Sequence, residues 1–321
     1  MKTRTLVYAF STLALAGALL FTGCKKKKEF KEENGQTSAD SKMATGENDA
    51  VNGDANTVLG NSSYTVLGGR IMQGAGVSTV SICGLTVDAT NMNSGSVLLN
   101  YDGTVCNNRK REGQIRLTIQ NFTAGVTYWK NPGCVLKVDY INYKMTRASD
   151  GKSIMLNGTQ YVTNVSGGNW WNLVLGQPNL VTTVSGTDLN ATFDDGKTAT
   201  YNINRKFTYT YSNLVFTCKG EGYGSHNGIG NLENYGTTRD GDDFTSEVTT
   251  PIIWNTTCGA WAPTQGAVDI KVAGKDFDLK VTFAVDNGGN PVEVAANTCA
   301  YGFKVEWSYK KKTNKKVFGY L

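Results

Sequence analysis

Residues 301–310 read YGFKVEWSYK, and residues 267–285 read AVDIKVAGKDFDLKVTFAV. In the first stretch every second residue is aromatic or apolar, and the residues between are polar or glycine. This period of two is the pattern of a half-buried β-strand. The second stretch contains two such alternating runs, and the Ala-Gly-Lys-Asp segment at 273–276 separates them. We therefore predict a β-hairpin over residues 267–285.

The same alternation continues toward the N-terminus, at residues 114–119 and 207–211. Glycine- and asparagine-containing turn signals recur between the alternating runs, at residues 101–104, 150–151, 157–158, 194–196 and 286–289. Gly and Asn supply the positive φ that tight turns need. Because many short strands with such turns are typical of all-β domains, we predict an antiparallel β-sandwich over residues 58–321, as one large or two packed sandwiches. If the domain is divided, the Gly- and Ser-rich stretch at 165–169 is the expected boundary.

The first residues have the three parts of a secretory signal. Lys2 and Arg4 are followed by an uncharged, apolar run at residues 5–21, and residues 20–24 read LFTGC. This segment resembles a bacterial lipobox, in which the chain is cut before a cysteine that then carries lipid. We therefore predict a signal peptide over residues 1–23 and lipidation of Cys24. An uncleaved N-terminal anchor helix is the alternative, since the apolar run is close to the length that spans a bilayer.

Residues 24–57 are poor in aromatic and β-branched residues and rich in charged and small polar ones. Such a segment buries too little apolar surface to offset the entropy of ordering, so we predict a disordered tether. Its lysines at 25–28 fit two roles, attraction to anionic lipid headgroups or a solvated spacer.

Six cysteines remain when Cys24 is set aside, and an even number in an exported chain indicates disulfides. In two of the possible cysteine pairs, one cysteine lies just before a predicted hairpin and the other just after a turn that follows it. The expected bridges are Cys83–Cys106, Cys258–Cys299 and, by elimination, Cys134–Cys218. For the last pair, two buried free thiols are the alternative.

No catalytic signature stands out. The single histidine, His226, lies outside any GxSxG context, and no cysteines have CxxC spacing. Asp240, Asp242 and Asp243 form a closely spaced acidic set that is a weak candidate for calcium, although the EF-hand pattern is not met. We predict no cofactor, no resident metal and no enzymatic activity.

Trp170 and Trp171 follow a Gly-Gly-Asn turn signal. On a strand these neighbours would face opposite sides of the sheet, so one would be buried and the other exposed. An exposed tryptophan can stack on a sugar ring, which makes the pair a candidate for ligand stacking. Packing at an edge or in a loop is the alternative.

Charge excludes one class of partner. The chain has 32 Lys and Arg residues against 27 Asp and Glu residues, and five of the lysines lie in residues 310–316. This distribution gives no broad basic face, so we expect no nucleic-acid partner.

The run at residues 100–115, NYDGTVCNNRKREGQI, resembles a pattern in uncharacterised β-rich lipoproteins of Bacteroidetes bacteria. Three further segments are similar to that group: the Pro-Gly pair at 132–133, the Phe-Asp-Asp-Gly run at 193–196 and the segment from Cys258 to Cys299. The resemblance implies an outer-membrane lipoprotein and no activity. In that group a lysine followed by acidic residues, just after the lipidated cysteine, marks export to the cell surface. Here four lysines follow Cys24 instead, which leaves the surface and the periplasmic face both open.

Together these patterns predict a non-catalytic, membrane-anchored lipoprotein that serves binding or envelope structure. Its expected partners are a membrane, through the N-terminal lipid, and a glycan or an envelope protein. The alternatives are an accessory subunit of an outer-membrane complex, which predicts an exposed apolar patch, and an extracytoplasmic glycan hydrolase, which predicts two facing carboxylates.

Overall fold

The structure is a computed structural model that describes residues 32–60, 82–258, 262–275, 277–294, 298–309 and 312–320. The predicted signal peptide and Cys24 lie outside these residues. The elements are α1 Glu32–Gly60, β1 Leu85–Asp88, η2 Met92–Ser94, β2 Ser96–Cys106, β3 Arg109–Ile119, β4 Cys134–Arg147, β5 Ser153–Asn164, α3 Trp170–Val174, β6 Leu180–Phe193, β7 Thr198–Ser212, β8 Val215–Gly222, β9 Gly224–His226, β10 Ile229–Thr237, β11 Asp243–Asn255, β12 Gln265–Val272, β13 Phe277–Val285, β14 Gly302–Tyr309 and β15 Lys312–Gly319.

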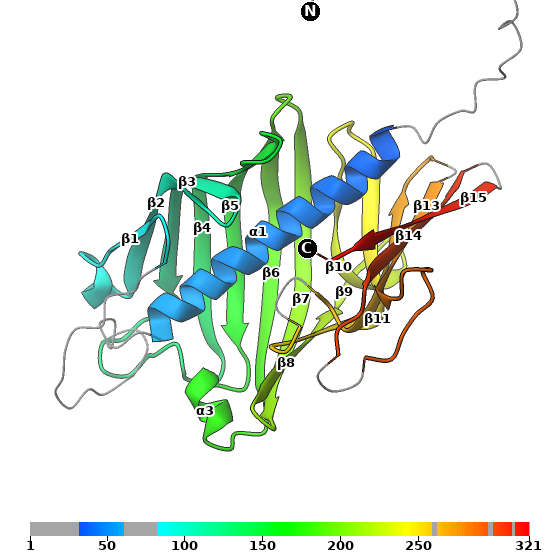
Figure 1. The fold of residues 1–321 in the computed structure, drawn as a ribbon. Helices are drawn as coiled ribbons and strands as arrows, with labels where there is room; N and C mark the ends of the chain where they lie inside the picture. The colour runs from blue at the N-terminus through cyan, green and yellow to red at the C-terminus, as the bar shows by residue number, and fades with distance from the viewer. Residues whose placement is uncertain are drawn as a thin grey trace, which may run out of the picture. The chain divides into compact units, whose positions relative to one another are not determined.

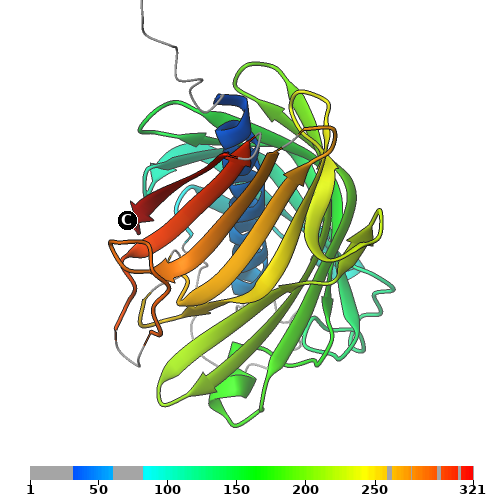
Figure 2. The same ribbon diagram turned by 90° about the vertical axis from the view of Figure 1, so that its right-hand side faces the viewer.

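The predicted all-β, antiparallel, sandwich-like class is confirmed. Across the described ranges, fifteen strands form one sheet, with the order β1 to β7 and then β10 to β15 along its main path. Strands β8 and β9 lie off this path, where β8 pairs with β7 and β11. Figure 1 shows β3–β7 behind α1, and Figure 2 shows β11–β15 in front of it. The two halves of one continuous sheet therefore curve around the helix.

The curvature has a local cause in a series of β-bulges. Register shifts occur at similar levels in β2, β4, β5 and β6. A bulge bends its strand and increases the local twist. Two predicted turns belong to this series: Gly103 (φ +86°) lies inside β2 and Gly158 (φ +127°) lies inside β5, so the turn predictions at these points were wrong. At Gly113 a Cβ atom would lie 2.1 Å from the Asn142 carbonyl oxygen, so this close approach requires glycine.

The core lies on the concave face of the sheet and follows the predicted alternation. Ile115, Leu117 and Ile119 are buried, as are the inward residues of the predicted 267–285 hairpin, Val268, Ile270, Val272, Leu279 and Val281. They belong to one apolar cluster that also includes Val51, Ala55, Val58 and Leu59 of α1. The helix is therefore part of the folded domain.

This helix is the main difference from the sequence interpretation. Residues 24–31 of the predicted tether lie outside the described residues, but Glu32–Gly60 is helical. Thr37–Leu321 forms one compact unit, and within it residues 165–169 only connect β5 to α3, so no subdivision occurs there. No helix in the described ranges combines the length and the apolarity that a membrane span requires.

Two of the three expected disulfides are confirmed. Cys83 bonds to Cys106, and Cys258 bonds to Cys299. The third pairing was wrong, because Cys134 and Cys218 are free thiols. They lie on β4 and β8, with β5, β6 and β7 between them. Four strand spacings of about 4.8 Å hold them roughly 19 Å apart, well beyond the reach of a disulfide.

Candidate functional site

Helix α1 is attached to the sheet by acidic side chains rather than by an apolar stripe alone. Glu47 accepts hydrogen bonds from Arg109 (2.9 Å) and from the Tyr143 hydroxyl (3.0 Å), and lies 3.7 Å from Arg111. About two helical turns further along, Asp54 accepts a hydrogen bond from Arg111 at 2.8 Å. Both arginines project from inward positions of β3, in phase with Ile115 and Leu117. The acidic residues of the helix thus neutralise basic residues on the concave face.

Amide side chains fix the position of the helix along the sheet. Asn48 donates to Gln160 of β5, and Gln160 donates to Asn52 at 3.0 Å. Near the end of the helix, the Trp129 indole N–H donates to Asn56 at 3.0 Å. Because each of these bonds has directional geometry, a shift of one helical turn would break several of them at once.

Burial changes the acidity of the helix carboxyls. Glu47 is only 1% exposed, and this desolvation raises its pKa above the ordinary value even though Arg111 and Arg109 act in the opposite direction. Burial likewise raises the pKa of Asp54 against the effect of Arg111. The paired charges therefore do not fully compensate for the loss of water, as expected for buried ion pairs.

A second ionic group lies at the middle of the helix. Arg205 of β7, whose side chain is 5% exposed, pairs with Asp49 of α1 and lies 3.6 Å from Glu233 of β10. Its guanidinium also stacks over the Phe207 ring, with the carbon 4.7 Å from the ring centre. One cation thus stands between two carboxylates, and the group carries a net charge of about −1 when all three are ionised.

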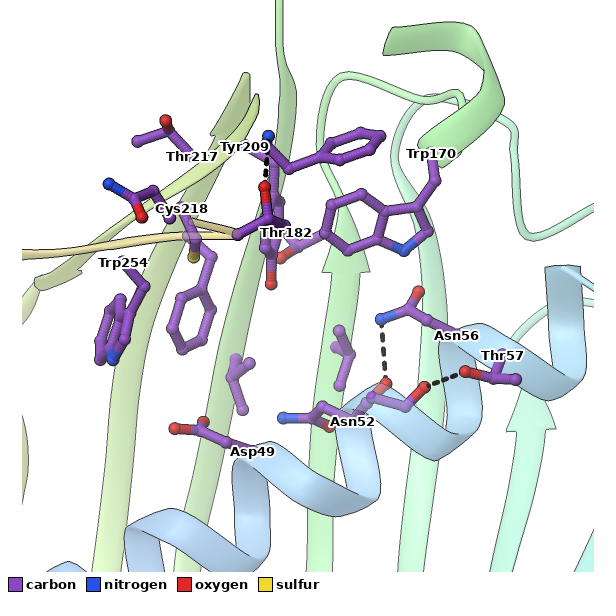
Figure 3. Close-up of a pocket in the computed structure, with 17 residues that line it drawn as sticks. Asp49, Asn52, Asn56, Thr57, Trp170, Thr182, Tyr209, Thr217, Cys218 and Trp254 are labelled. Atoms are coloured by element: carbon purple, nitrogen blue, oxygen red, sulfur yellow. Dashed lines mark hydrogen bonds between the residues drawn. The ribbon is translucent and has the colours of Figure 1, made fainter. Parts of the chain in front are cut away.

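Between α1 and the sheet lies a cavity of about 620 Å³, which Figure 3 shows in close-up. The sheet side is mainly apolar and includes Val162, Val184, Phe207, Phe216 and Trp254. The helix side is polar and consists of Asp49, Asn52, Gly53, Asn56 and Thr57. A cavity of this size with apolar walls and a few polar groups on one side is typical of a small-molecule site.

A second cavity of about 400 Å³ continues along the helix toward its N-terminal part. Its walls include Ile252, Val281 and Phe283 from the strands. Asp49 and Trp254 line both cavities, so the two adjoin one another at the Asp49–Arg205 pair. We call the two cavities together the helix cleft.

Two glycines keep the helix cleft open. Gly53 lines the larger cavity and Gly46 the smaller one, seven residues apart and so on the same side of the helix. A Cβ atom at either position would meet no atom within 4 Å. Glycine inside a helix costs about 1 kcal/mol relative to alanine, so these residues do not favour helix formation. Their effect in this fold is to leave volume beside the sheet.

The structure places the two predicted stacking residues at one end of the cleft. Trp170 and Trp171 begin α3, a short helix capped by Asn169, and not a strand as the prediction assumed. Trp170 lines the larger cavity and meets the Phe216 ring edge-on at 5.4 Å between centres. Trp171 is 58% exposed. Trp170 is itself 38% exposed, so neither ring is buried, and the prediction that one of the two would be buried was wrong.

The acidic set proposed for calcium is not assembled. Asp240 pairs with Lys197 at 2.6 Å and Asp242 with Lys275 at 2.5 Å. Nowhere in the part of the chain that the structure describes do three His, Cys, Asp or Glu side chains gather as a metal site would require. These carboxylates serve ion pairs between neighbouring turns.

The free thiols do not form a reactive pair. Cys218 lines the larger cavity, and burial raises the pKa of its thiol to about 12. Burial also raises the pKa of Cys134, to about 11. Both are therefore protonated at neutral pH, and a protonated thiol is a poor nucleophile.

Sequence reasoning missed the helix side of the cleft altogether. One signal was present on the strand side: Arg205 occupies an inward position of β7, in phase with Tyr201, Ile203 and Phe207. An arginine at a position facing the core needs a buried partner. That requirement could have pointed to an acidic element covering the sheet.

No known protein family, no curated protein and no solved structure matches this chain. The functional inference therefore rests on the residues of the cleft.

Proposed function

We propose that this chain is a lipid-anchored cell-envelope protein that binds the hydrocarbon chain of a lipid in the helix cleft, without chemical conversion. The observation that carries the proposal is the cavity of about 620 Å³ beneath α1, walled by apolar residues of the sheet. Each methylene group that leaves water for such a site contributes about 0.8 kcal/mol. A hydrocarbon chain is thus the ligand that this lining favours most.

The ionic group in the cleft limits the choice of ligand further. Asp49 and Glu233 both pair with Arg205, so an additional anion at this point would meet a local excess of negative charge. The other polar side chains on the helix side, Asn52, Asn56 and Thr57, are neutral, and each already makes a hydrogen bond within the protein. We therefore expect the hydrocarbon part to enter the cleft and any charged headgroup to stay outside it.

The glycan hydrolase alternative is less well supported. It needs two carboxyl groups that face a bound sugar across an open cleft. The carboxylates lining the two described cavities are Asp49 and Glu233, and both are held by Arg205. This arrangement leaves neither of them placed as a proton donor to a ligand.

A binding titration tests the proposed function. The probe is a fluorescent long-chain fatty acid added to the mature chain, residues 24–321, without vesicles. We expect saturable binding of about one probe per chain, with displacement by an unlabelled phospholipid of short chain length. Native mass spectrometry of protein purified from cells should also show a lipid adduct. Absence of both saturable binding and any adduct would contradict the proposal.

The anchor is tested separately. The LFTGC segment motivates lipidation of Cys24, so the variant Cys24→Ser should lose both the processing and the membrane association of the native chain. Protease treatment of intact cells, with lysed cells as the control, then decides between the surface and the periplasmic face. An unchanged processed mass in Cys24→Ser would exclude the lipid anchor while leaving the cleft untouched.

A further inference from the structure

Exposed apolar side chains gather at one end of the sheet. This end is defined by strand pairing: Cys134, at the start of β4, faces Asn164, at the end of β5, and the start of β6 faces the end of β7. Three connections meet there: residues 120–133, residues 165–179 with α3, and the β7–β8 turn at 213–214. We call them the tip.

The tip displays large apolar groups with little cover. Leu175 is 81% exposed and Leu214 is 85% exposed, with Val126 at 64% and Trp171 at 58%. Figure 1 shows α3 and the turn between β7 and β8 at the same edge. Such side chains are costly in water when several of them lie in one region, and they mark interaction surfaces.

Two of the three connections are hydrogen-bonded to each other, and α3 contacts β8, the strand that follows the third connection. The Gly168 N–H donates to the Lys130 carbonyl oxygen at 2.7 Å, and the Asn164 side chain donates to the Trp129 carbonyl oxygen at 3.0 Å. The contact of Trp170 with Phe216 joins α3 to β8. The tip is therefore a built surface and not a set of separate loops.

Charged residues are scarce in the tip and abundant at the opposite end of the sheet. Residues 117–129, 153–187 and 207–218 contain no Asp, Glu, Lys or Arg. The opposite turns carry ion pairs such as Arg147–Asp150 and Lys197–Asp240, at 2.6 Å each. Lys130 is the charged residue within the tip, and it is basic. A surface of this kind meets a hydrocarbon boundary without the desolvation of an acidic group.

The apolar surface of the tip is continuous with the helix cleft. Trp170 lines the larger cavity and also a smaller one of about 180 Å³, whose walls include Trp129 and Trp171. A path lined by aromatic side chains thus runs from the exposed tip to the apolar interior. A ligand taken from a membrane at the tip would reach the cleft without crossing the charged end.

We infer that the tip docks on a lipid bilayer, with Trp171, Leu175 and Leu214 inserted at the boundary between headgroups and acyl chains. Tryptophan favours this boundary, where its ring is in an apolar environment and its N–H is in contact with water. A bilayer also suits three short protruding connections, because a fluid surface needs no matching shape. This inference goes beyond the proposed function, and the two can fail independently.

Vesicle binding tests the inference. The sample is the mature chain with Cys24→Ser, which removes the lipid, and the vesicles contain phosphatidylethanolamine and phosphatidylglycerol. We expect the chain to co-sediment with vesicles. The double variant Leu175→Asp/Leu214→Asp should bind vesicles at least about tenfold more weakly, since inserting charged groups into the membrane boundary costs free energy. Both leucines are exposed, so the substitutions leave the fold intact. Val105→Asp is the matched control: Val105 is 58% exposed but lies at the charged end.

The outcomes separate the possibilities. Loss of vesicle binding in the double variant, with Val105→Asp unchanged, supports the bilayer. Equal binding by all three chains, or no binding by the parent chain, overturns the inference. So does a tip that binds an envelope protein, a second copy of the chain or a glycan in crosslinking and pull-down experiments while vesicles do not bind. Fatty-acid titration without vesicles should give the same affinity for the double variant, which keeps failure of the tip distinct from failure of the cleft.

Discussion

Gly53 offers the sharpest test of the helix cleft, because the same position can be filled in two ways. Its backbone is helical and a Cβ atom there would meet nothing within 4 Å. Gly53→Ala should therefore raise the free energy of unfolding by about 1 kcal/mol, through helix propensity alone. For a domain of this size such a gain corresponds to a rise in Tm of about 2–4 °C.

Gly53→Phe uses the same backbone but extends into the cavity of about 620 Å³. Phenylalanine is also a better helix former than glycine, so the variant should fold at least as stably as the parent chain. If its ring displaces about four methylene groups of a bound hydrocarbon chain, the loss is about 3 kcal/mol at 0.8 kcal/mol for each group. That loss weakens binding by roughly two orders of magnitude.

The assay combines thermal unfolding with fatty-acid titration on the parent chain and both variants. Gly53→Ala should be more stable and bind nearly normally, and Gly53→Phe should keep its stability and lose affinity. Because both variants retain the fold, reduced binding cannot be attributed to unfolding. Normal binding by Gly53→Phe would refute the idea that the ligand occupies this cavity. A fall in the stability of Gly53→Ala would refute the geometry assigned to the helix.

Three further predictions concern charge and sulfur. Burial raises the folded-state pKa of Glu47 above its ordinary value of 4.5. The stability of the parent chain relative to Glu47→Gln should therefore be greatest below pH 4.5 and should fall as the pH rises through the raised pKa. Urea unfolding at several pH values measures this difference, and a difference that grew with pH would contradict the prediction. Thiol titration of the denatured, unreduced chain with Cys24→Ser should find two thiols, Cys134 and Cys218, and these should react slowly in the native protein. Fast native labelling would contradict their burial. Replacing both Cys258 and Cys299 with Ser removes a bridge between positions 41 residues apart. The free energy of unfolding, measured with denaturant, should fall by about 4 kcal/mol. A fall below about 1 kcal/mol would show that the bridge does not restrain the unfolded chain.

The strands were predictable because burial on one face imposes a period of two. Ile115, Leu117 and Ile119 show this in β3, as do Val268 and Ile270 in β12. The sequence also indicated which glycines have a positive φ, but it did not show whether each one lies in a turn or inside a strand. Gly103 and Gly158 have the positive φ that a turn needs, yet they lie at register shifts inside strands. A positive φ satisfies either structure, and only the pairing of neighbouring strands decides between them.

Helix α1 was not predictable from periodicity for a physical reason. A surface helix normally reveals itself by an apolar stripe, whereas the inner side of α1 combines Val51 and Ala55 with polar residues such as Glu47 and Asn48, all buried. The information that makes this segment helical lies on the strands, in Arg109, Arg111 and Arg205 and in the tyrosine hydroxyls beside them. Reading residues 32–57 without these partners leaves only a polar chain.

The composition that concealed the helix is also what creates the cleft. Had Gly46 and Gly53 been leucines, the helix would have shown a clear apolar stripe, and their side chains would have filled the space against Phe207, Trp254 and Phe283. A helix held by ion pairs and amides at defined points does not need continuous apolar contact to stay in place. It therefore covers an apolar face without filling it. That combination, a polar cover over an apolar floor, is the arrangement that a site for a hydrocarbon chain requires.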